Sequence, residues 1–502
     1  AKLPDPFKFM NGTRMTSKDQ WPARRAEISA LAQTFEFGTK PPKPASVTGS
    51  YSGNRITVTC SEGGRSISFA ATIQYPSTGR APYPALIGIG SSSLDNNAIL
   101  SSGVAIINFP NDEIGQQINS SSRGKGKFYD LYGSSHSAGA LMAWAWGVSR
   151  LIDALETTPA ANIDASRIGV TGCSRNGKGA LVAGAFDERI VLTIPQESGS
   201  GGAASWRVSD AQKASGQNVQ TLSQIITENC WFSTALNQFN NQTNKLPFDH
   251  HMIEAMCAPR ALLVIENTSM EWLGNLSCYT TAQAAHMVYE ALGIPDRMGF
   301  SQIGNHNHCV FPASQQAELK AFIQKFLVGE GSSNTNVNRT DGNFSFDKAR
   351  WIDWTIPNLS STISGPTVTP SPSVLIPPTI TFIPTLSPSP SPSLPGSGGY
   401  TISYTQNDWG SGATVSIIIK NNSSAAVNGW NLAFSFSGNQ KITNLWNGKY
   451  TQSGTAVTVT NESWNSTIPV GGSVNFGFNL SYSGSNPKPT GFTLNGVACQ
   501  EQ

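Results

Sequence analysis

The sequence has few charged residues. Asp, Glu, Lys and Arg make up 13% of its 502 residues, roughly half the usual share. The net charge of +2 gives no electrostatic reason to expect nucleic acid or an anionic membrane as a partner. No apolar run approaches the roughly 20 residues that span a bilayer. The start at Ala1 has neither a cationic nor an apolar leader, which predicts a mature, secreted chain.

The cysteines lack the spacing of a metal or redox motif. There are seven of them and no C-x-x-C pair, which disfavours a zinc ribbon or a thioredoxin-like site. We expect neither a metal nor a cofactor. In an oxidising compartment at least one thiol must stay unpaired, because the number is odd.

A stretch rich in Pro, Ser and Thr divides the chain. It runs from 364 to 399 and reads SGPTVTPSPSVLIPPTITFIPTLSPSPSPSLPGSGG. Proline fixes φ and lacks an N–H donor, so this stretch predicts an extended spacer. The alternative, a long loop inside one domain, is disfavoured because compact domains seldom contain such loops. We predict a first domain over 1–358, a linker over 359–399 and a second domain over 400–502.

Before the linker, short apolar runs alternate with segments of helical periodicity. The runs are nearly continuous, as in strands buried on both faces, and they cover 83–90, 103–110, 167–172, 190–196 and 260–266. The helical segments cover 139–156, 178–186 and 280–293. This order predicts an α/β fold with a mainly parallel sheet between helical layers, and residues 56–76 predict an antiparallel hairpin before it.

After the linker the pattern changes to short strands separated by regular turns. Examples are TVSIIIKN, WNLAFSFSG and SVNFGFNLSYSG. About 100 residues of this pattern predict one small all-β sandwich.

The segment RIGVTGCSRNGKG, which begins at residue 167, predicts a strand, a sharp turn and a helix around Ser174. A nucleophile elbow usually reads G-x-S-x-G, but here Asn176 replaces the second glycine and Gly177 follows one place later. Asn tolerates unusual backbone angles better than most residues. Ser174 is therefore a candidate nucleophile, the alternative being an ordinary serine in a glycine-rich turn.

A histidine loop follows where an α/β-hydrolase places its base. Residues 299–312 contain His306 and His308, and Cys309 follows His308 as Cys173 precedes Ser174. A disulfide between these cysteines would join the nucleophile loop to the base loop, the alternative being two buried free thiols. Glu197 and Glu266 both follow predicted strands in the order Ser, Glu, His, and spacing does not decide which of them orients the histidine.

Several segments together resemble the glucuronoyl esterases of carbohydrate esterase family 15. These are GCSRNGKGA, PQESGSGG, ENCWF, MEWLG and NHNHC, and the likeness covers about residues 1 to 358. The resemblance implies an α/β-hydrolase three-layer sandwich. It also implies cleavage of the ester between 4-O-methyl-glucuronic acid branches of glucuronoxylan and lignin alcohols.

The resemblance also implies roles for single residues. Ser174 attacks the carbonyl, His308 moves the proton, Glu197 orients His308, and Arg175 stabilises the oxyanion. Glu266 shares or replaces the role of Glu197, as in some bacterial relatives. The implied sugar-binding residues are Lys178, Gln220, Glu228 and Trp272.

The second domain resembles a family 2 carbohydrate-binding module. Trp409, Trp446 and Trp464 match the exposed row that stacks on cellulose in that family, while Trp430 matches its core tryptophan. The disulfide common in that family is not expected, because Tyr400 stands at the position of the partner of Cys499.

We therefore predict a secreted, monomeric esterase without a cofactor, tethered to cellulose and acting on glucuronoxylan–lignin esters. Two rivals stay open: an acetyl-xylan or feruloyl esterase with the same triad, and a non-catalytic protein that binds plant cell walls. The sequence does not identify the natural alcohol.

Overall fold

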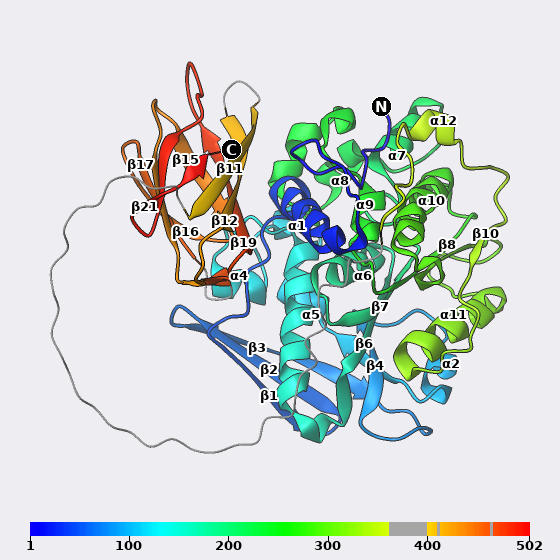
Figure 1. Cartoon of the computed structure of the whole chain (residues 1–502). Coiled ribbons are helices and arrows are strands. Elements are labelled where there is room, and N and C mark those ends of the chain that lie inside the picture. The colour runs from blue at the N-terminus through cyan, green and yellow to red at the C-terminus, as the bar shows by residue number, and fades with distance from the viewer. Residues whose placement is uncertain (361–398, 409–411, 462–464, 502) are drawn as a thin grey trace. The chain divides into compact units, whose positions relative to one another are not determined.

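The computed structural model describes residues 1–360, 399–408, 412–461 and 465–501 (Figure 1). The chain divides into two compact units, Ala1–Val368 and Thr369–Gln502. Most of the predicted linker, residues 361–398, lies outside the described residues. Within the described ranges, no helix combines the length and the apolar character that a membrane crossing requires.

The first unit is built on a ten-stranded sheet in the order β1-β2-β3-β5-β4-β6-β7-β8-β9-β10. The first three strands form an antiparallel meander, and β3 joins β5 in antiparallel fashion. From β5 onward every neighbouring pair is parallel. The strands are β1 (Ser46–Ser52), β2 (Arg55–Glu62), β3 (Arg65–Gln74), β4 (Tyr83–Ile89), β5 (Ala105–Phe109), β6 (Ile163–Cys173), β7 (Ile190–Gln196), β8 (Ala261–Glu266), β9 (Met298–Gln302) and β10 (Asn338–Thr340).

Helices cover both faces of the sheet, which explains why the parallel strands are apolar on both sides. In β4, Ile87 packs into one core and Leu86 into the other. The first core contains residues of α5, α6 and α10, and the second contains residues of α2 and α11, which lie together in Figure 1. The helices are α1 (Trp21–Ala32), α2 (Asn96–Ser101), α3 (Asn111–Ile114), α4 (Lys127–Tyr132), α5 (Ala140–Thr157), α6 (Arg175–Phe186), α7 (Trp206–Ala214), α8 (Leu222–Glu228), α9 (His250–Ala255), α10 (Asn275–Leu292), α11 (Gln316–Ile323) and α12 (Lys348–Trp351).

This architecture confirms the predicted α/β-hydrolase three-layer sandwich. The chemically interesting segments follow the carboxyl ends of β5, β6, β7, β8 and β9, where parallel α/β sheets place their ligand sites.

The second unit consists of β-strands, and its two main sheets have five strands each. Buried side chains of both sheets, such as Ile417 and Phe434, share one core. Trp430 is buried there and stacks on Phe476 with ring centroids 5.7 Å apart. This confirms the all-β sandwich and the core position of Trp430. One sheet contains β15 (Lys441–Trp446), β19 (Ser473–Ser481), β12 (Gly412–Asn421), β11 (Tyr400–Asp408) and β22 (Gln500–Glu501), and the other contains β16 (Lys449–Ser453), β17 (Ala456–Thr460), β14 (Asn431–Ser435), β20 (Thr490–Leu494) and β21 (Val497–Ala498).

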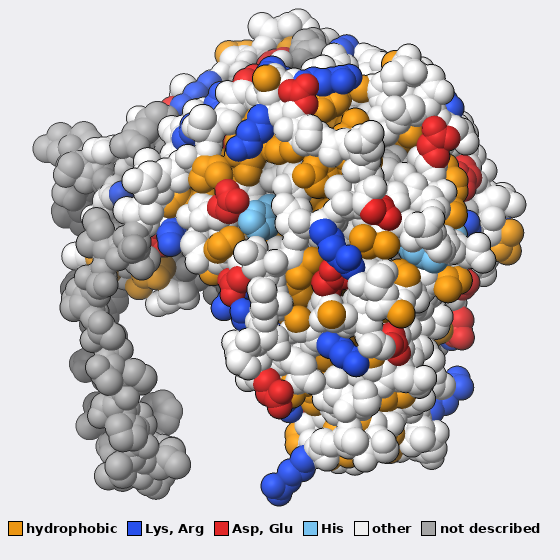
Figure 2. Space-filling model, turned by 90° about the vertical axis from the view of Figure 1, so that its right-hand side faces the viewer, with side chains coloured by type: hydrophobic (Ala, Val, Ile, Leu, Met, Phe, Trp, Pro, Cys, Tyr) orange, Lys and Arg blue, Asp and Glu red, His pale blue; other side chains and the backbone are white. Residues whose placement is uncertain are grey.

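The surface reflects the low charge content of the sequence. On the face drawn in Figure 2, acidic and basic side chains of the described residues are scattered among hydrophobic and uncharged polar side chains. Such a surface suits an uncharged polymer as a partner better than a polyanion.

Candidate functional site

Ser174 stands alone between the end of β6 and the start of α6. Its backbone has φ 62° and ψ −128°, a region that costs a non-glycine residue free energy and is seen at functional turns. Two backbone hydrogen bonds hold the turn: the Ser174 N–H donates to the Gln196 carbonyl at 2.9 Å, and the Lys178 N–H donates to the Ser174 carbonyl at 3.1 Å. The predicted strand, turn and helix are therefore present.

The glycines explain how the turn tolerates the missing second elbow glycine. A Cβ on Gly172 would lie 2.4 Å from the Asn176 carbonyl oxygen, and a Cβ on Gly177 would lie 2.6 Å from the Gln196 carbonyl oxygen. Both positions need glycine for close backbone approach. The Asn176 side chain instead accepts a hydrogen bond from Asn111 Nδ2 at 3.2 Å. Gly177, one residue after the usual position, therefore takes the place of the second glycine of the motif.

His308 and Glu197 form the pair that the sequence predicted as one of two options. His308 Nδ1 lies 2.7 Å from Glu197 Oε2, and Cys309 N–H and Asn267 Nδ2 donate to the same oxygen at 3.0 and 3.3 Å. Glu197 is fully buried. Its carboxylate assigns the proton of His308 to Nδ1, which leaves Nε2 as the acceptor. Within the described residues, Nε2 has no hydrogen-bond partner.

Glu266, the other candidate acid, contacts the turn after Glu197. Its Oε1 accepts hydrogen bonds from the Ser198 N–H at 2.9 Å, the Ser198 hydroxyl at 3.2 Å and the Gly199 N–H at 3.2 Å. In the described part of the chain no hydrogen bond joins Glu266 to His308. The pKa of Glu266 is raised from 4.5 to about 7, chiefly by burial and in part by the nearby Glu197 carboxylate, while the hydrogen bonds from residues 198 and 199 oppose the shift.

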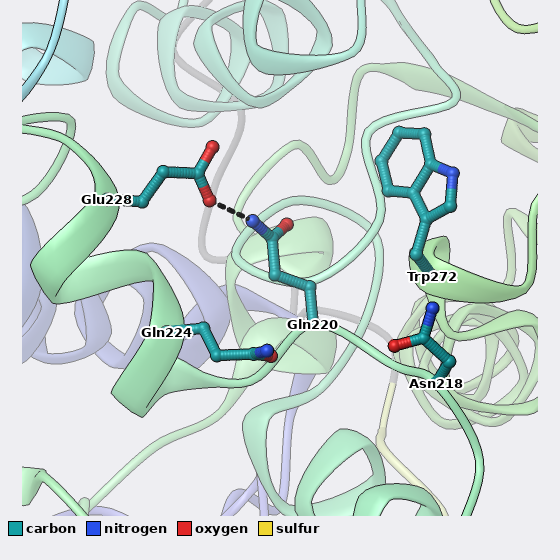
Figure 3. A pocket seen from close by; sticks show the side chains of 5 residues that line it. All are labelled: Asn218, Gln220, Gln224, Glu228 and Trp272. Carbon is teal, nitrogen blue, oxygen red and sulfur yellow. Dashed lines mark hydrogen bonds between the residues drawn. The ribbon is translucent and has the colours of Figure 1, made fainter.

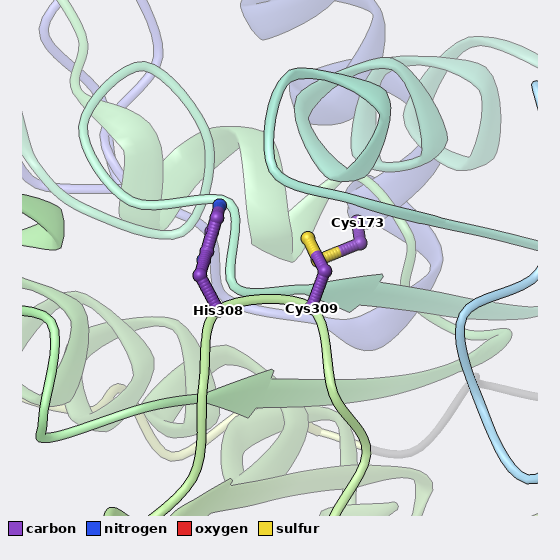
Figure 4. A group of neighbouring side chains, drawn as sticks. All are labelled: Cys173, His308 and Cys309. Atoms are coloured by element: carbon purple, nitrogen blue, oxygen red, sulfur yellow. A yellow bond between two sulfur atoms is a disulfide. The ribbon is translucent and has the colours of Figure 1, made fainter.

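The predicted disulfide between Cys173 and Cys309 is present (Figure 4). It links the residue before Ser174 to the residue after His308. The two sulfurs and a ring nitrogen of His308 lie within 4.8 Å of one another, but sulfurs in a disulfide do not act as thiolate ligands, so this cluster does not argue for a metal. The other cysteines are unpaired, as expected for Cys499.

Arg175 and Lys178 both contact the ring of Trp231. The Arg175 guanidinium carbon lies 5.0 Å from the centroid of this ring, and the Lys178 ammonium lies 5.9 Å from it. Arg175 Nη1 also donates to Gln117 Oε1 at 3.3 Å. Lys178 is buried, and its Nζ donates to the Ser198 carbonyl at 2.5 Å. Burial lowers the pKa of Lys178 to about 8, with Glu266 opposing the shift.

Three of the predicted sugar-binding residues line one cavity (Figure 3). Its volume is about 250 Å³, and it is lined by Asn218, Gln220, Gln224, Glu228 and Trp272. Gln220 Nε2 donates to Glu228 Oε2 at 2.5 Å. The Trp272 ring packs edge-on against His308 with centroids 4.7 Å apart, so the cavity adjoins the proposed base.

Sequence reasoning missed several polar residues of the site. Asn267 follows Glu266 directly and bonds Glu197, yet only the position at the end of a strand pointed to it. Asn218 and Gln224 belong to no recognisable sequence motif. They line the cavity only because of the way the segment after β7 folds. Trp231 lies inside the quoted ENCWF segment, although no role was expected for it.

Two other histidines, His250 and His306, have different surroundings. His250 is buried, with its Nδ1 2.6 Å from the Gly202 carbonyl oxygen and its Nε2 2.7 Å from Glu36 Oε1, contacts that indicate a structural role. His306 lies beside the His308–Glu197 pair, with its Nδ1 3.8 Å from Glu197 Oε1 and its Nε2 2.9 Å from the Ile303 carbonyl oxygen. His308, not His306, faces the disulfide and Trp272.

Two of the predicted cellulose-binding tryptophans, Trp409 and Trp464, lie outside the described residues. Trp446 is the last residue of β15, and only its backbone is described. The stacking role of all three stays a prediction.

Comparisons with known proteins match both units. A family model described as "Glucuronyl esterase, fungi" matches residues 58–293, and one described as "Cellulose binding domain" matches residues 400–499. A 4-O-methyl-glucuronoyl methylesterase of Hypocrea jecorina is 58% identical over 360 residues, which are 72% of this chain and 76% of that protein. One from Podospora anserina is 54% identical over 362 residues, 72% of this chain and 75% of that protein.

Solved structures of glucuronoyl esterases are also similar to this chain. The catalytic domain of a glucuronoyl esterase from Hypocrea jecorina has a TM-score of 0.69 and 58% identity, covering 72% of this chain and 97% of that one. A mutant glucuronoyl esterase from Sporotrichum thermophile, solved in complex with methyl 4-O-methyl-β-D-glucopyranuronate, has a TM-score of 0.68 and 51% identity, covering 72% and 96%.

Proposed function

Because the chain belongs to the glucuronoyl esterases of carbohydrate esterase family 15, we propose that it hydrolyses glucuronate esters by a serine mechanism with Ser174 as nucleophile. Membership makes the chain a carboxylic ester hydrolase. A serine hydroxyl needs a base to remove its proton, an acid to orient that base, and donors for the oxyanion.

In the first half-reaction, Ser174 Oγ bonds to the carbonyl carbon of the ester while His308 Nε2 takes the hydroxyl proton. The carbonyl electron pair moves to the oxygen and forms a tetrahedral oxyanion. When that pair returns, the bond to the alkoxy oxygen breaks, and the imidazolium gives its proton to the departing alcohol. Water repeats the sequence on the acyl-enzyme and releases the uronic acid.

Arg175 suits the oxyanion for two reasons. Its backbone N–H opens α6, where helix N–H groups face an anion, and its guanidinium keeps its charge at any working pH. The contacts of the side chain with Gln117 and Trp231 fix its direction. A preorganised charge of this kind stabilises a developing oxyanion without rearrangement.

The cavity beside Trp272 suits the uronate. Gln220, Glu228 and their neighbours offer hydrogen bonds to ring hydroxyls, and Trp272 offers an apolar surface to a pyranose face. The sugar ester bound by the Sporotrichum thermophile relative supports this assignment. We extend it to 4-O-methyl-glucuronate branches of glucuronoxylan esterified to lignin alcohols.

The second unit supports the proposal that the enzyme acts at the surface of plant cell walls. It matches a cellulose-binding domain, and tethering an enzyme near an insoluble polymer raises the effective concentration of scarce ester bonds. The proposal therefore includes secretion and action by a single chain on lignocellulose.

The observation that carries the proposal is the His308–Glu197 pair, which the disulfide joins to the Ser174 turn. The test compares initial rates of the wild type on benzyl glucuronate, an acetylated xylan and methyl ferulate. We expect clear preference for the glucuronate ester. Preference for an acetyl or feruloyl ester would overturn the uronate assignment, and turnover of none would favour a non-catalytic wall-binding protein.

A further inference from the structure

A second cavity adjoins Arg175, the residue after Ser174, and shares no lining residue with the cavity beside Trp272, called the sugar cavity here. Its volume is about 530 Å³, and it is lined by Asp112, Glu113, Gln116, Gln117, Ile118 and Arg175. This volume falls in the range of about 300–1,000 Å³ that is common for small-molecule sites. Below it is called the Ile118 cavity.

The order of the strands separates the two cavities. In the sheet, β6 lies between β4 and β7, and β5 lies beyond β4. Five of the residues that line the Ile118 cavity follow β5, and Arg175 follows β6. The residues of the sugar cavity follow β7 and β8. Apart from Arg175, the lining residues of the two cavities therefore follow strands on opposite sides of β6, the strand that leads into Ser174.

An ester has two halves that diverge from its carbonyl carbon. If the uronate fills the sugar cavity, the alkoxy oxygen must stay near His308, which returns the proton. The carbons beyond that oxygen then need room outside the sugar cavity. The Ile118 cavity offers such room and shares Arg175 with the reaction centre.

The wall of the Ile118 cavity is held in place by hydrogen bonds. Gln117 Nε2 donates to Asp112 Oδ1 at 2.9 Å, and Gln117 Oε1 accepts from Arg175 at 3.3 Å and from Trp231 Nε1 at 3.0 Å. The Gln117 backbone carbonyl accepts from Asn229 Nδ2 at 2.9 Å. These bonds fix both ends of the Gln117 amide, so the wall is ready before a ligand arrives.

The lining suits an aromatic alcohol that carries hydroxyl groups. Ile118 is 82% exposed, and its backbone N–H is held by the Ser122 hydroxyl at 3.1 Å. An apolar side chain held out beside a reaction centre can cover one face of an aromatic ring. The exposed carboxylates of Asp112 and Glu113 can accept hydrogen bonds from phenolic hydroxyls.

We propose that the Ile118 cavity binds the alcohol half of the ester as an aryl-alkyl alcohol, with Ile118 against the ring. The inference rests on the proposed function, because it assigns the other half of the same ester. It predicts that Ile118 contributes to selection among alcohols and not to recognition of the sugar.

The test compares two esters of one acid, benzyl glucuronate and methyl glucuronate, on wild type and Ile118→Ser. The variant removes apolar contact that only the larger alcohol reaches, so kcat/KM for the benzyl ester should fall about fivefold or more. The value for the methyl ester should stay within about twofold. Ile118→Leu keeps the apolar surface and should retain the preference for benzyl. Ile118 is exposed, so folding is not at risk.

Gln224→Ala is the matched control on the sugar side, because it should lower kcat/KM for both esters by the same factor. Equal effects of Ile118→Ser on the two esters, or none on either, would overturn the inference while the proposed function stands. A wild type that hydrolyses neither ester would overturn the proposed function and the inference with it.

Discussion

Glu197 and Glu266 are both buried at the ends of neighbouring strands, yet they contact different partners. Glu197 is hydrogen-bonded to the ring of His308. Glu266 instead accepts hydrogen bonds from the backbone N–H groups of Ser198 and Gly199 and from the Ser198 hydroxyl. Lys178 Nζ donates a hydrogen bond to the Ser198 carbonyl oxygen. Glu197 itself has φ 45°, a strained backbone that needs such support. We therefore expect Glu266 to act by positioning Glu197.

Replacing Glu266 should separate positioning from acid chemistry. Glu266→Ala removes all three hydrogen bonds to the turn, so kcat should fall about 10- to 100-fold, as for other supporting residues. Glu266→Gln keeps an oxygen acceptor and should stay within about threefold of the wild type. Glu197→Ala should lose much more than either. Steady-state kinetics on benzyl glucuronate measures all three variants.

The opposite ranking would contradict this account. If Glu266 acted as a second triad acid, Glu266→Gln would lose as much activity as Glu266→Ala, because an amide cannot stabilise an imidazolium.

Glu266 should also make the stability of the first unit depend on pH. Burial raises its pKa from 4.5 to about 7, so the folded state keeps its proton after the unfolded state has released it. The free energy of unfolding should therefore fall as pH rises from about 4.5 to about 7, by about 3 kcal/mol in all. The glutamine of Glu266→Gln does not titrate, so the free energy of unfolding of this variant should not show this fall. The difference in melting temperature between the two proteins, measured from pH 4 to 8, checks it, and a pH-independent difference would contradict it.

At the scale of elements, the sequence predicted the central strands well because each is an apolar run buried on both faces. It missed β9 as a strand, because its residues Met298–Gln302 include Gly, Ser and Gln and show no apolar run. It also placed the start of α6 at 178, whereas the helix begins at Arg175. Asn176 and Gly177 are poor helix formers. They nevertheless lie in the first turn of α6, where the helix passes close to the backbone at the end of β7.

The sequence predicted only those parts of the site that local sequence patterns reveal. Ser174, His308 and Cys309 stand next to sequence motifs, so their neighbourhood could be inferred. Which acid meets His308 depends on how β7 and β8 end in space, and spacing along the chain does not encode that. Asn267 and Gln117 act through long-range contacts and leave no local pattern.

The disulfide should contribute to both stability and activity, because it joins the elbow after β6 to the loop after β9. Cys173→Ala/Cys309→Ala should lower the free energy of unfolding of the first unit by about 2–4 kcal/mol. It should also lower kcat, since His308 is no longer held beside the turn. Thermal unfolding and kinetics of the variant test this, with Cys499→Ala as a control that removes an unpaired cysteine. An unchanged melting temperature would refute the stabilising role.

At the scale of the whole molecule, two units divide the work between chemistry and attachment. The first matches glucuronoyl esterases and the second a cellulose-binding domain. This division was readable from sequence, because a change of periodicity flanks a Pro-rich stretch. It implies that binding to cellulose and hydrolysis of a soluble ester can be changed separately.

Trp446→Ala tests this separation. Loss of one stacking surface should weaken adsorption to microcrystalline cellulose about 5- to 10-fold, while kcat/KM on soluble benzyl glucuronate stays unchanged. Tyr450→Ala is the matched control, because Tyr450 is an exposed aromatic residue on β16 of the other sheet. Equal losses of adsorption in both variants, or none in Trp446→Ala, would contradict the predicted binding face.

The central claim is that Ser174 is the nucleophile, and covalent labelling tests it most directly. Wild type and Ser174→Ala are treated with an organophosphonate ester that reacts with activated serines, and peptide masses and benzyl glucuronate hydrolysis are followed in parallel. We predict one adduct per chain on Ser174, loss of activity in proportion to labelling, and neither adduct nor activity in Ser174→Ala. Hydrolysis that persists after full labelling of Ser174, or near-normal activity in Ser174→Ala, would contradict the account.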